Sequence, residues 1–189
     1  MSSDRLTSFS YVVLVLVGER GAGAHDLVRM ARQGRVYADF ADSQWYAEPK
    51  RLARLGYLTA RREPGRTRER THYLLTEQGL AALRRWMSEP SGFSRMFLEP
   101  AIRLLSADLV GDQLVLQSLA GLRETAADLL ARIDLAEQVA RTIPHRERYL
   151  LLNHRLARRL VEAHVAWLDE VEAQLARRRS RPARHHEGC

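Results

Sequence analysis

The stretch from Asp42 to Thr76 constrains the fold of this chain more than any other, because it reads as a helix, a turn and two strands joined by a basic loop. Asp42 and Ser43 are both favourable N-cap residues, and the helix they would begin extends to Leu55. Gly56 follows at the position just past a helix end, where a left-handed conformation is usual. The sequence therefore predicts a short helix that ends in this glycine.

The apolar residues of this helix recur at helical spacing, so one of its sides is expected to face a core. These residues are Trp45, Pro49, Leu52 and Leu55. A proline in a regular helix interior costs about 3 kcal/mol, so Pro49 is unusual there. The open side carries small, amide, aromatic and cationic residues, namely Ser43, Gln44, Tyr46, Ala47, Lys50, Arg51 and Arg54.

Two strand-like runs follow, Tyr57–Arg61 and Thr71–Leu75. The loop between them contains a Pro-Gly turn inside a dense arginine cluster. The positions expected to point inward are Leu58, Ala60, Tyr73 and Leu75. A capped helix with a cationic open side, followed by a cationic hairpin, is typical of a winged helix-turn-helix.

Charge supports an anionic partner for this hairpin. The chain of 189 residues has a formal net charge of +7 and a pI near 10.3, which favours nucleic acid first and an acidic membrane surface second. The arginines of the hairpin would neutralise phosphates and release counterions, which makes affinity salt-dependent. They are Arg61, Arg62, Arg66, Arg68 and Arg70.

The N-terminal part superficially matches a signal peptide, because an apolar run over 9–17 follows Arg5. Asp4 and the Glu19-Arg20 pair argue against that interpretation, so we expect a buried first helix over about 6–18. The only cysteine is Cys189, which excludes an intramolecular disulfide, and no apolar run approaches the length of a transmembrane helix. We expect a cytoplasmic protein.

The rest of the N-terminal half completes the winged-helix order. The glycine-rich segment 18–23 lacks a Gly-Lys-Ser/Thr sequence and is expected to be a plain connection rather than a phosphate loop. A second helix is expected over 24–33 and a fourth over 77–87, capped by Thr76. Its inward residues would be Leu80, Leu83 and Met87. The break at 89–92 predicts a DNA-binding domain over residues 1–90.

Residues 91–178 are almost purely helix-forming and predict a helical dimerisation and effector domain. We expect a helix over 93–109 and then a long one from Asp112 to Ile143 with an unbroken heptad seam. A second long helix over 147–178, about 45 Å in length, would fold back on it. Its expected seam is Tyr149, Leu152, Leu156, Leu160, Ala163, Trp167, Val171 and Leu175.

Helices of this length leave apolar surface that a second copy of the chain would cover, which predicts a two-fold homodimer. The tail over 179–189 is basic, poor in apolar residues and expected to be disordered. The expected fold class is mainly α with a small β-hairpin: an N-terminal winged helix-turn-helix plus C-terminal long antiparallel helices.

Three segments resemble the PadR family of bacterial winged-helix repressors. They are Gly23–Val28, Tyr46–Leu58 with its Arg-Leu-x-x-Leu-Gly pattern, and Tyr73–Gly79. The sequence Trp-Leu-Asp-Glu at 167–170 is similar to the subgroup with a long helical dimerisation domain. The chain departs from the family at Ala24-His25, where the family often has Gly-Tyr, and at Pro49, where it often has leucine.

The resemblance implies a recognition helix in the DNA major groove, to which Ser43, Gln44, Tyr46 and Lys50 map, with Arg51 beside them. It implies a wing carrying Arg66, Arg68 and Arg70 along the backbone or minor groove. It also implies a small hydrophobic or aromatic effector that loosens DNA binding. Candidates to line its cavity are Trp86, Phe97 and Trp167, although large aromatics at a dimer seam more often simply pack.

Other function classes have weaker support. The sequence contains no Gly-x-Ser-x-Gly motif, no paired carboxylates in an apolar setting and no Cys/His pair on ordered elements, so we expect neither an enzyme nor a cofactor. The histidines lack metal spacing, and the His185-His186 tail lacks supporting groups. Two alternatives stay open: a non-specific nucleoid-type DNA binder, and a protein-interaction winged helix, which would favour a neutral, apolar open side.

Overall fold

The computed structural model describes residues 5–33, 40–64, 69–92 and 98–179. The chain divides into two compact units, Met1–Phe93 and Ser94–Cys189. Each unit has its own core and is described by itself. The predicted fold class is confirmed: a winged helix with a small antiparallel sheet, and long helices.

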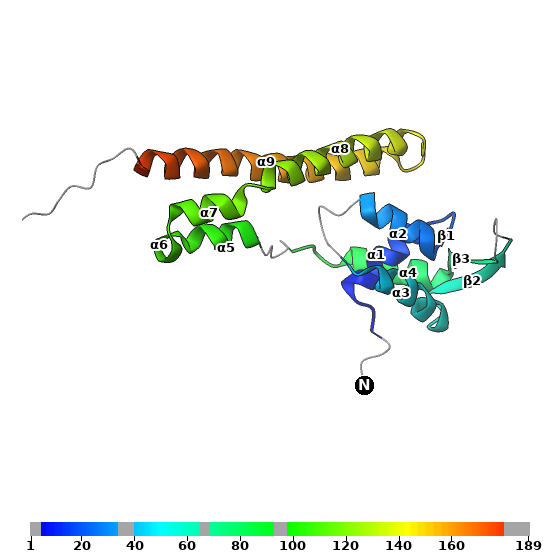
Figure 1. The fold of residues 1–189 in the computed structure, drawn as a ribbon. Coiled ribbons are helices and arrows are strands. Elements are labelled where there is room, and N and C mark those ends of the chain that lie inside the picture. Colours follow the sequence, from blue (N-terminus) through cyan, green and yellow to red (C-terminus); the bar gives the residue numbers. More distant parts are fainter. Residues whose placement is uncertain (1–4, 34–39, 65–68, 93–97, 180–189) are drawn as a thin grey trace, which may run out of the picture. The chain divides into compact units, whose positions relative to one another are not determined.

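The first unit has the predicted order of helices and strands, with one further strand, β1, that was not predicted (Figure 1). Its elements are α1 (Ser8–Val17), β1 (Ala22–Gly23), α2 (Ala24–Gln33), α3 (Asp42–Arg54), β2 (Leu58–Glu63), β3 (Arg70–Leu75) and α4 (Glu77–Ser88). The sheet order is β1-β3-β2 with antiparallel neighbours, and β2 pairs with β3 from Leu58↔Leu75 to Glu63↔Arg70.

One hydrophobic cluster holds this unit together, with side chains from α1, α2, α3 and the sheet. Removing such side chains from water is the main favourable contribution to folding. Gly56 has φ 82°, as predicted for the end of α3, and Thr76 Oγ1 donates to its carbonyl at 2.7 Å. The cluster comprises Phe9, Val13, Leu14, Val17, Ala22, Leu27, Val28, Trp45, Leu52, Leu58 and Tyr73.

Four predictions for this unit are wrong in detail. The glycine-rich segment is not a plain connection, because it ends in β1, and a Cβ on Gly21 would come within 2.6 Å of the Tyr73 carbonyl oxygen. The N-cap of α3 is Ala41, so Asp42 is already helical. Ala60 is exposed rather than inward, and Met87 is 72% exposed. In α4 the buried positions are Gly79 and Ala82.

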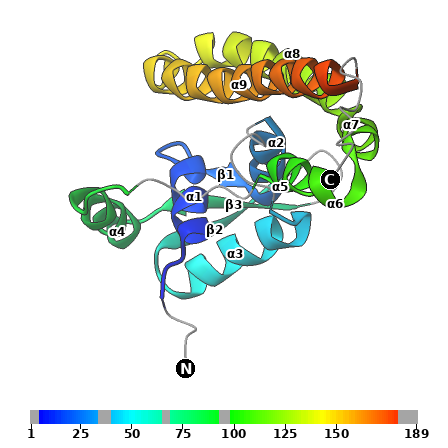
Figure 2. The same cartoon turned by 90° about the vertical axis from the view of Figure 1, so that its left-hand side faces the viewer.

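The second unit consists of helices, and α8 and α9 lie side by side along their lengths (Figures 1 and 2). Val115 and Leu119 pack with Leu168, Val171 and Leu175 of α9 in a buried cluster. The elements are α5 (Glu99–Leu105), α6 (Ala107–Val110), α7 (Asp112–Leu119), α8 (Leu122–Arg141) and α9 (Glu147–Arg179).

The long helices predicted before residue 143 are interrupted. Ser106 separates α5 from α6, and residues 93–97 of the first predicted helix lie outside the described residues. The second prediction, from Asp112 to Ile143, divides into α7 and α8 at Ala120-Gly121. The heptad positions nevertheless stay on the inward side through this break, since Val115, Leu119 and then Ala126, Ile133, Ala136 and Ala140 are buried.

The predicted seam of α9 is correct only toward its C-terminal end, and Ala163 in the middle of the helix is exposed. Val171 and Leu175 are buried there, but Tyr149, Leu152 and Leu156 are 67%, 52% and 52% exposed. The N-terminal half instead buries Ala157 and Val161. Apolar residues therefore cover more than one side of α9.

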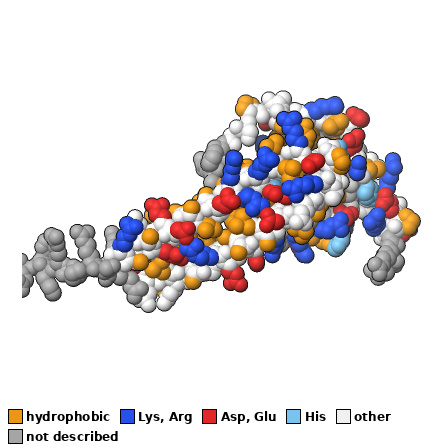
Figure 3. All heavy atoms as spheres, turned by 90° about the horizontal axis from the view of Figure 1, so that it is seen from above, with side chains coloured by type: hydrophobic (Ala, Val, Ile, Leu, Met, Phe, Trp, Pro, Cys, Tyr) orange, Lys and Arg blue, Asp and Glu red, His pale blue; other side chains and the backbone are white. Residues whose placement is uncertain are grey.

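Ion pairs join α8 to α9 at two places. Arg123 Nη2 lies 2.5 Å from Asp169 and 2.6 Å from Glu172, and Arg158 Nη2 lies 2.6 Å from Asp134. These hydrogen bonds raise the pKa of both arginines. Seen from above in Figure 3, acidic and basic side chains are interspersed, with hydrophobic side chains exposed among them.

Candidate nucleic-acid interface

The open side of α3 forms a shallow groove of about 490 Å³. The lining residues recur at helical spacing, so they share one side of the helix. Small side chains lie near the N-terminal end and two cations near the C-terminal end. The groove is lined by Ser43, Tyr46, Ala47, Lys50 and Arg54.

The buried side of α3 fixes the direction in which this groove faces. The Trp45 ring meets the Phe9 ring of α1 edge-on at 4.8 Å between centroids, and Phe40 lies 6.0 Å from Trp45. Pro49 and Leu52 are buried one and two turns further along, as predicted. With these anchors inside, the groove residues face outward, and β2 follows directly and packs against α3.

Gln44 is exposed next to the groove but has a structural partner. Its Oε1 accepts a hydrogen bond from the backbone N–H of Ala41 at 3.2 Å, which satisfies one donor at the start of α3. A bidentate contact to adenine uses both the carbonyl oxygen and the amide nitrogen of a glutamine. The Oε1 of Gln44 has a second lone pair for such a contact, but its bond to Ala41 already restricts how the side chain can turn.

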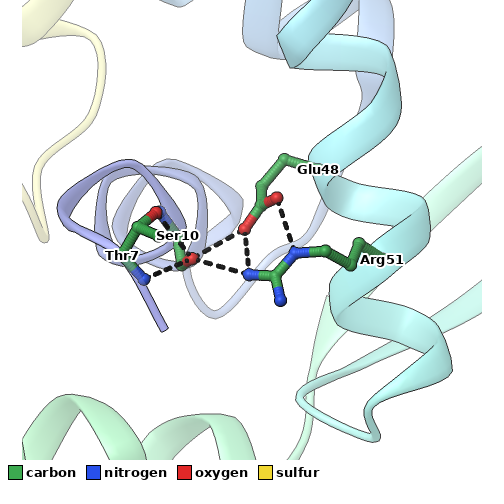
Figure 4. A network of polar contacts seen from close by, with 4 residues as sticks. All are labelled: Thr7, Ser10, Glu48 and Arg51. Atoms are coloured by element: carbon green, nitrogen blue, oxygen red, sulfur yellow. Dashed lines mark hydrogen bonds and ion pairs between the residues drawn. The ribbon is translucent and has the colours of Figure 1, made fainter. Parts of the chain in front are cut away.

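Arg51 does not line the groove with the other predicted residues. Its side chain turns toward α1, where Nη2 donates to Ser10 Oγ at 3.0 Å, and it is 21% exposed. Nε and Nη2 also donate to the two carboxylate oxygens of Glu48 at 2.9 and 2.7 Å. Figure 4 shows this network between α1 and α3.

Glu48 has an altered acidity in this setting. Burial by itself would raise the pKa of its carboxyl group, but the hydrogen bonds from Arg51 and Ser10 and the positive charge of Arg51 outweigh it. The pKa is lowered as a result. The carboxylate is thus held in its charged form.

The hairpin β2–β3 carries the cations of the predicted wing. Arg61 is exposed, and Arg62 Nη1 lies 3.4 Å from Glu69 Oε2. Arg70 Nη2 lies 3.4 Å from Glu63 Oε2, so two of the described wing arginines have acidic neighbours in the free protein. Arg66 and Arg68 lie outside the described residues.

The predicted effector residues fall in different units. Trp86 of α4 stacks on Tyr11 of α1 with 4.7 Å between ring centroids and 9° between planes, and it is 41% exposed. Trp167 is half-buried against the cluster of α7 and α9. Both aromatics thus pack within their own unit, and Phe97 lies outside the described residues.

Two groove residues, Ala47 and Arg54, were not among the predicted DNA contacts. Arg54 lies one helical turn beyond Lys50, and its spacing placed it on the open side, but it was not counted among the DNA contacts. Ala47 was placed on the open side but carries no polar group.

The described residues offer little for other chemistry. Within them, no group of three or more His, Cys, Asp or Glu side chains is placed to hold a metal ion. None of the helices in this part of the chain is both long enough and apolar enough to cross a membrane.

Comparison with known proteins shows which solved structures share this fold. No family model and no curated protein matches the chain. Among solved structures, Bacillus subtilis PadR in complex with operator DNA is 20% identical, with a TM-score of 0.71 over 91% of this chain and 99% of PadR. This chain has the PadR fold.

Two further structures share this PadR fold. The Vibrio cholerae virulence activator AphA is 22% identical, with a TM-score of 0.70 over 89% of this chain and 98% of AphA. Bacillus subtilis PadR in complex with p-coumaric acid is 17% identical, with a TM-score of 0.61 over 89% of this chain and 98% of that chain.

Proposed function

We propose that this protein is a cytoplasmic, sequence-specific regulator of transcription that binds double-stranded DNA. The observation that carries the proposal is the exposed groove of α3, which presents Lys50 and Arg54 beside Ser43 and Tyr46. A helix with such a side, followed by a cationic hairpin, is the arrangement with which winged helix-turn-helix proteins enter the major groove. The PadR structure with operator DNA supports the same assignment.

The proposed roles divide along α3 and the wing. Ser43, Gln44, Tyr46 and Lys50 contact base edges and nearby phosphates, because the N-terminal part of a recognition helix reads the bases. The wing arginines, with Arg66, Arg68 and Arg70 first, contact the backbone and supply most of the salt-dependent affinity. Arg51 holds α3 in place instead of contacting DNA.

The protein acts as a homodimer in this proposal. In the second unit Tyr149, Leu152 and Leu156 of α9 are exposed, and so are Leu135 and Val139 of α8. Exposed apolar patches of this kind are typical of association surfaces. A two-fold pair would bring two recognition helices to half-sites ~34 Å apart or a multiple of it.

We further propose repression that a small aromatic effector relieves. The PadR structure with p-coumaric acid supports an effector of this class. Trp86, Phe97 and Trp167 remain the candidate contacts. Because AphA is a virulence activator, the direction of regulation needs its own test, a reporter gene under the bound promoter with and without the protein.

The deciding experiment selects bound fragments of the host genome with the purified protein and measures their affinity across a salt series. We expect a few fragments with a shared, two-fold symmetric sequence. Recovery of fragments without a shared sequence would favour a nucleoid-type binder, and no recovery at low salt would favour a protein-interaction module. Genes beside the recovered fragments would suggest effectors to test for release.

A further inference from the structure

The recognition helix α3 contains a proline in its interior, and a side-chain network spans that position. Pro49 lies in the middle of the continuous helix Asp42–Arg54. Proline has no N–H, so the Trp45 carbonyl lacks the hydrogen bond it would otherwise accept, and the ring crowds that carbonyl. The interruption falls between the N-terminal half, with Ser43 and Tyr46, and the C-terminal half, with Lys50 and Arg54.

Glu48 and Arg51 lie on either side of this interruption and are joined to each other in a bidentate pair. Arg51 Nε donates to Oε2 of Glu48 at 2.9 Å, and Nη2 donates to Oε1 at 2.7 Å. Both side chains are largely buried: that of Arg51 is 21% exposed and that of Glu48 is 13% exposed. The planar arginine fork matches a carboxylate in this way and holds both groups in one geometry.

The same pair is tied to α1 through Ser10, which is fully buried. Ser10 Oγ donates to Glu48 Oε1 at 2.6 Å and accepts from Arg51 Nη2 at 3.0 Å (Figure 4). It also accepts from the backbone N–H of Thr7 at 2.9 Å, at the capped start of α1. The network therefore connects both halves of α3 to the N-terminus of another helix.

We propose that Ser10, Glu48 and Arg51 form a positioning clamp that bridges the Pro49 interruption and holds the recognition helix in the orientation that binds DNA. The inference rests on the proposed DNA-binding function. It assigns to these residues no contact with DNA. Their effect on affinity comes through the placement of Lys50, Arg54 and Tyr46.

The clamp and a direct contact predict opposite results for one substitution. Glu48→Gln removes the charge that holds Arg51. If Arg51 were a phosphate contact, this change would release a cation and tighten binding. If the clamp positions α3, the change replaces the charge-assisted bidentate pair between Glu48 and Arg51 by a weaker neutral contact and weakens DNA binding, by about ten- to hundredfold.

The experiment measures affinity for a selected DNA fragment with the full-length protein and the variants Ser10→Ala and Glu48→Gln. Glu162→Gln is the control, since it removes the same charge from an exposed position of α9. We expect both clamp variants to bind more weakly with an unchanged salt slope, and the control to bind as the parent does. Equal or tighter binding by Glu48→Gln would overturn the proposal.

The variant Pro49→Ala tests whether the clamp compensates for the helix interruption at Pro49. Pro49→Ala restores an N–H that can reach the Trp45 carbonyl, so α3 no longer needs the clamp to span that point. We expect Glu48→Gln to weaken binding about tenfold or more in the parent and only about twofold in the Pro49→Ala background. The same loss of affinity in both backgrounds would overturn the bridging role.

Hydrogen exchange without DNA separates failure of the clamp from failure of the proposed function. We expect the α3 amides of Glu48→Gln to exchange faster than those of the parent, while the α8 amides stay unchanged. Faster exchange in a protein whose parent binds no DNA fragment would refute the proposed function and leave the clamp intact. Unchanged exchange would refute the clamp while DNA binding by the parent stands.

Discussion

Glu63 and Arg70 are direct partners in the register of β2 and β3, and Arg70 Nη2 lies 3.4 Å from Glu63 Oε2. The same carboxylate oxygen lies 3.8 Å from His72 Nδ1. A second pair joins Arg62 Nη1 to Glu69 Oε2 at 3.4 Å, although the register partner of Arg62 is Thr71. Exposed pairs like these contribute about 0–1 kcal/mol each, so DNA phosphates can replace the glutamates.

The first prediction is that removing these glutamate charges strengthens DNA binding. In Glu63→Gln/Glu69→Gln, Arg62 and Arg70 no longer have to give up a glutamate before they bind a DNA phosphate. Two negative charges that repel the phosphates are also removed. We expect affinity to rise by up to about fivefold per pair. Gel-shift titration at several salt concentrations measures this change.

The matched variant in the wing is Arg70→Ala, which removes one proposed phosphate contact. The salt slope should fall by about 0.9. Glu162→Gln on α9 controls for the general change in net charge. Unchanged affinity in the double glutamine variant, together with an unchanged slope in Arg70→Ala, would exclude β2–β3 as a DNA contact.

The second prediction separates base reading from backbone contact within the groove of α3. Lys50→Ala should reduce the preference for the selected sequence, by about 1–3 kcal/mol if Lys50 contacts a base edge. Arg54 lies in the last turn, so Arg54→Ala should weaken all sequences alike and lower the salt slope by about 1. Competition with shuffled DNA measures both, and Arg85→Ala on α4 is the exposed cationic control.

Much of the first unit could be predicted from the sequence because its local signals agree with one another. The helix α3 was placed within about two residues by apolar spacing and by Gly56, and the hairpin by two strand-like runs around a Pro-Gly turn. Arg51 was predicted on the open side of α3 because a charged side chain is normally expected to face solvent. The hydrogen bonds with Glu48 and Ser10 make its partial burial favourable instead. The strand β1 has two residues, too few for any alternation.

The second unit was harder to predict because its helices are apolar on more than one side. Leu152 and Leu156 have the same spacing as a buried seam, yet Ala157 and Val161 are the residues that face inward. Only the partner helix decides which side is covered. The break at Ala120-Gly121 leaves both residues in the right-handed helical region of the backbone, so the heptad pattern passes through it unaltered.

The third prediction concerns stability against pH. Because the folded protein lowers the pKa of Glu48 below the ordinary 4.5, its contribution to stability is present above pH 4.5 and is lost as the pH falls through the lowered value. Glu48→Gln should therefore be less stable than the parent at pH 7 and approach it under more acidic conditions. Urea unfolding followed by tryptophan fluorescence from pH 7 to about 3 measures the difference. A constant difference across this range would contradict the role of the Glu48 charge.

The fourth prediction concerns self-association through the exposed side of α9. Leu156 is 52% exposed, so Leu156→Asp should leave the packing of α8 against α9 intact while placing a charge in the proposed dimer surface. Leu129 belongs to the inward side of α8 and is partly buried, so Leu129→Asp would disturb the fold as well. We expect the parent to sediment as a dimer and Leu156→Asp as a monomer with an unchanged circular dichroism spectrum.

Ala166→Asp adds the same charge at another exposed position of α9 and should stay dimeric. A parent that sediments as a monomer would remove the dimer from the proposed function, and a dimeric Leu156→Asp would place the contact elsewhere.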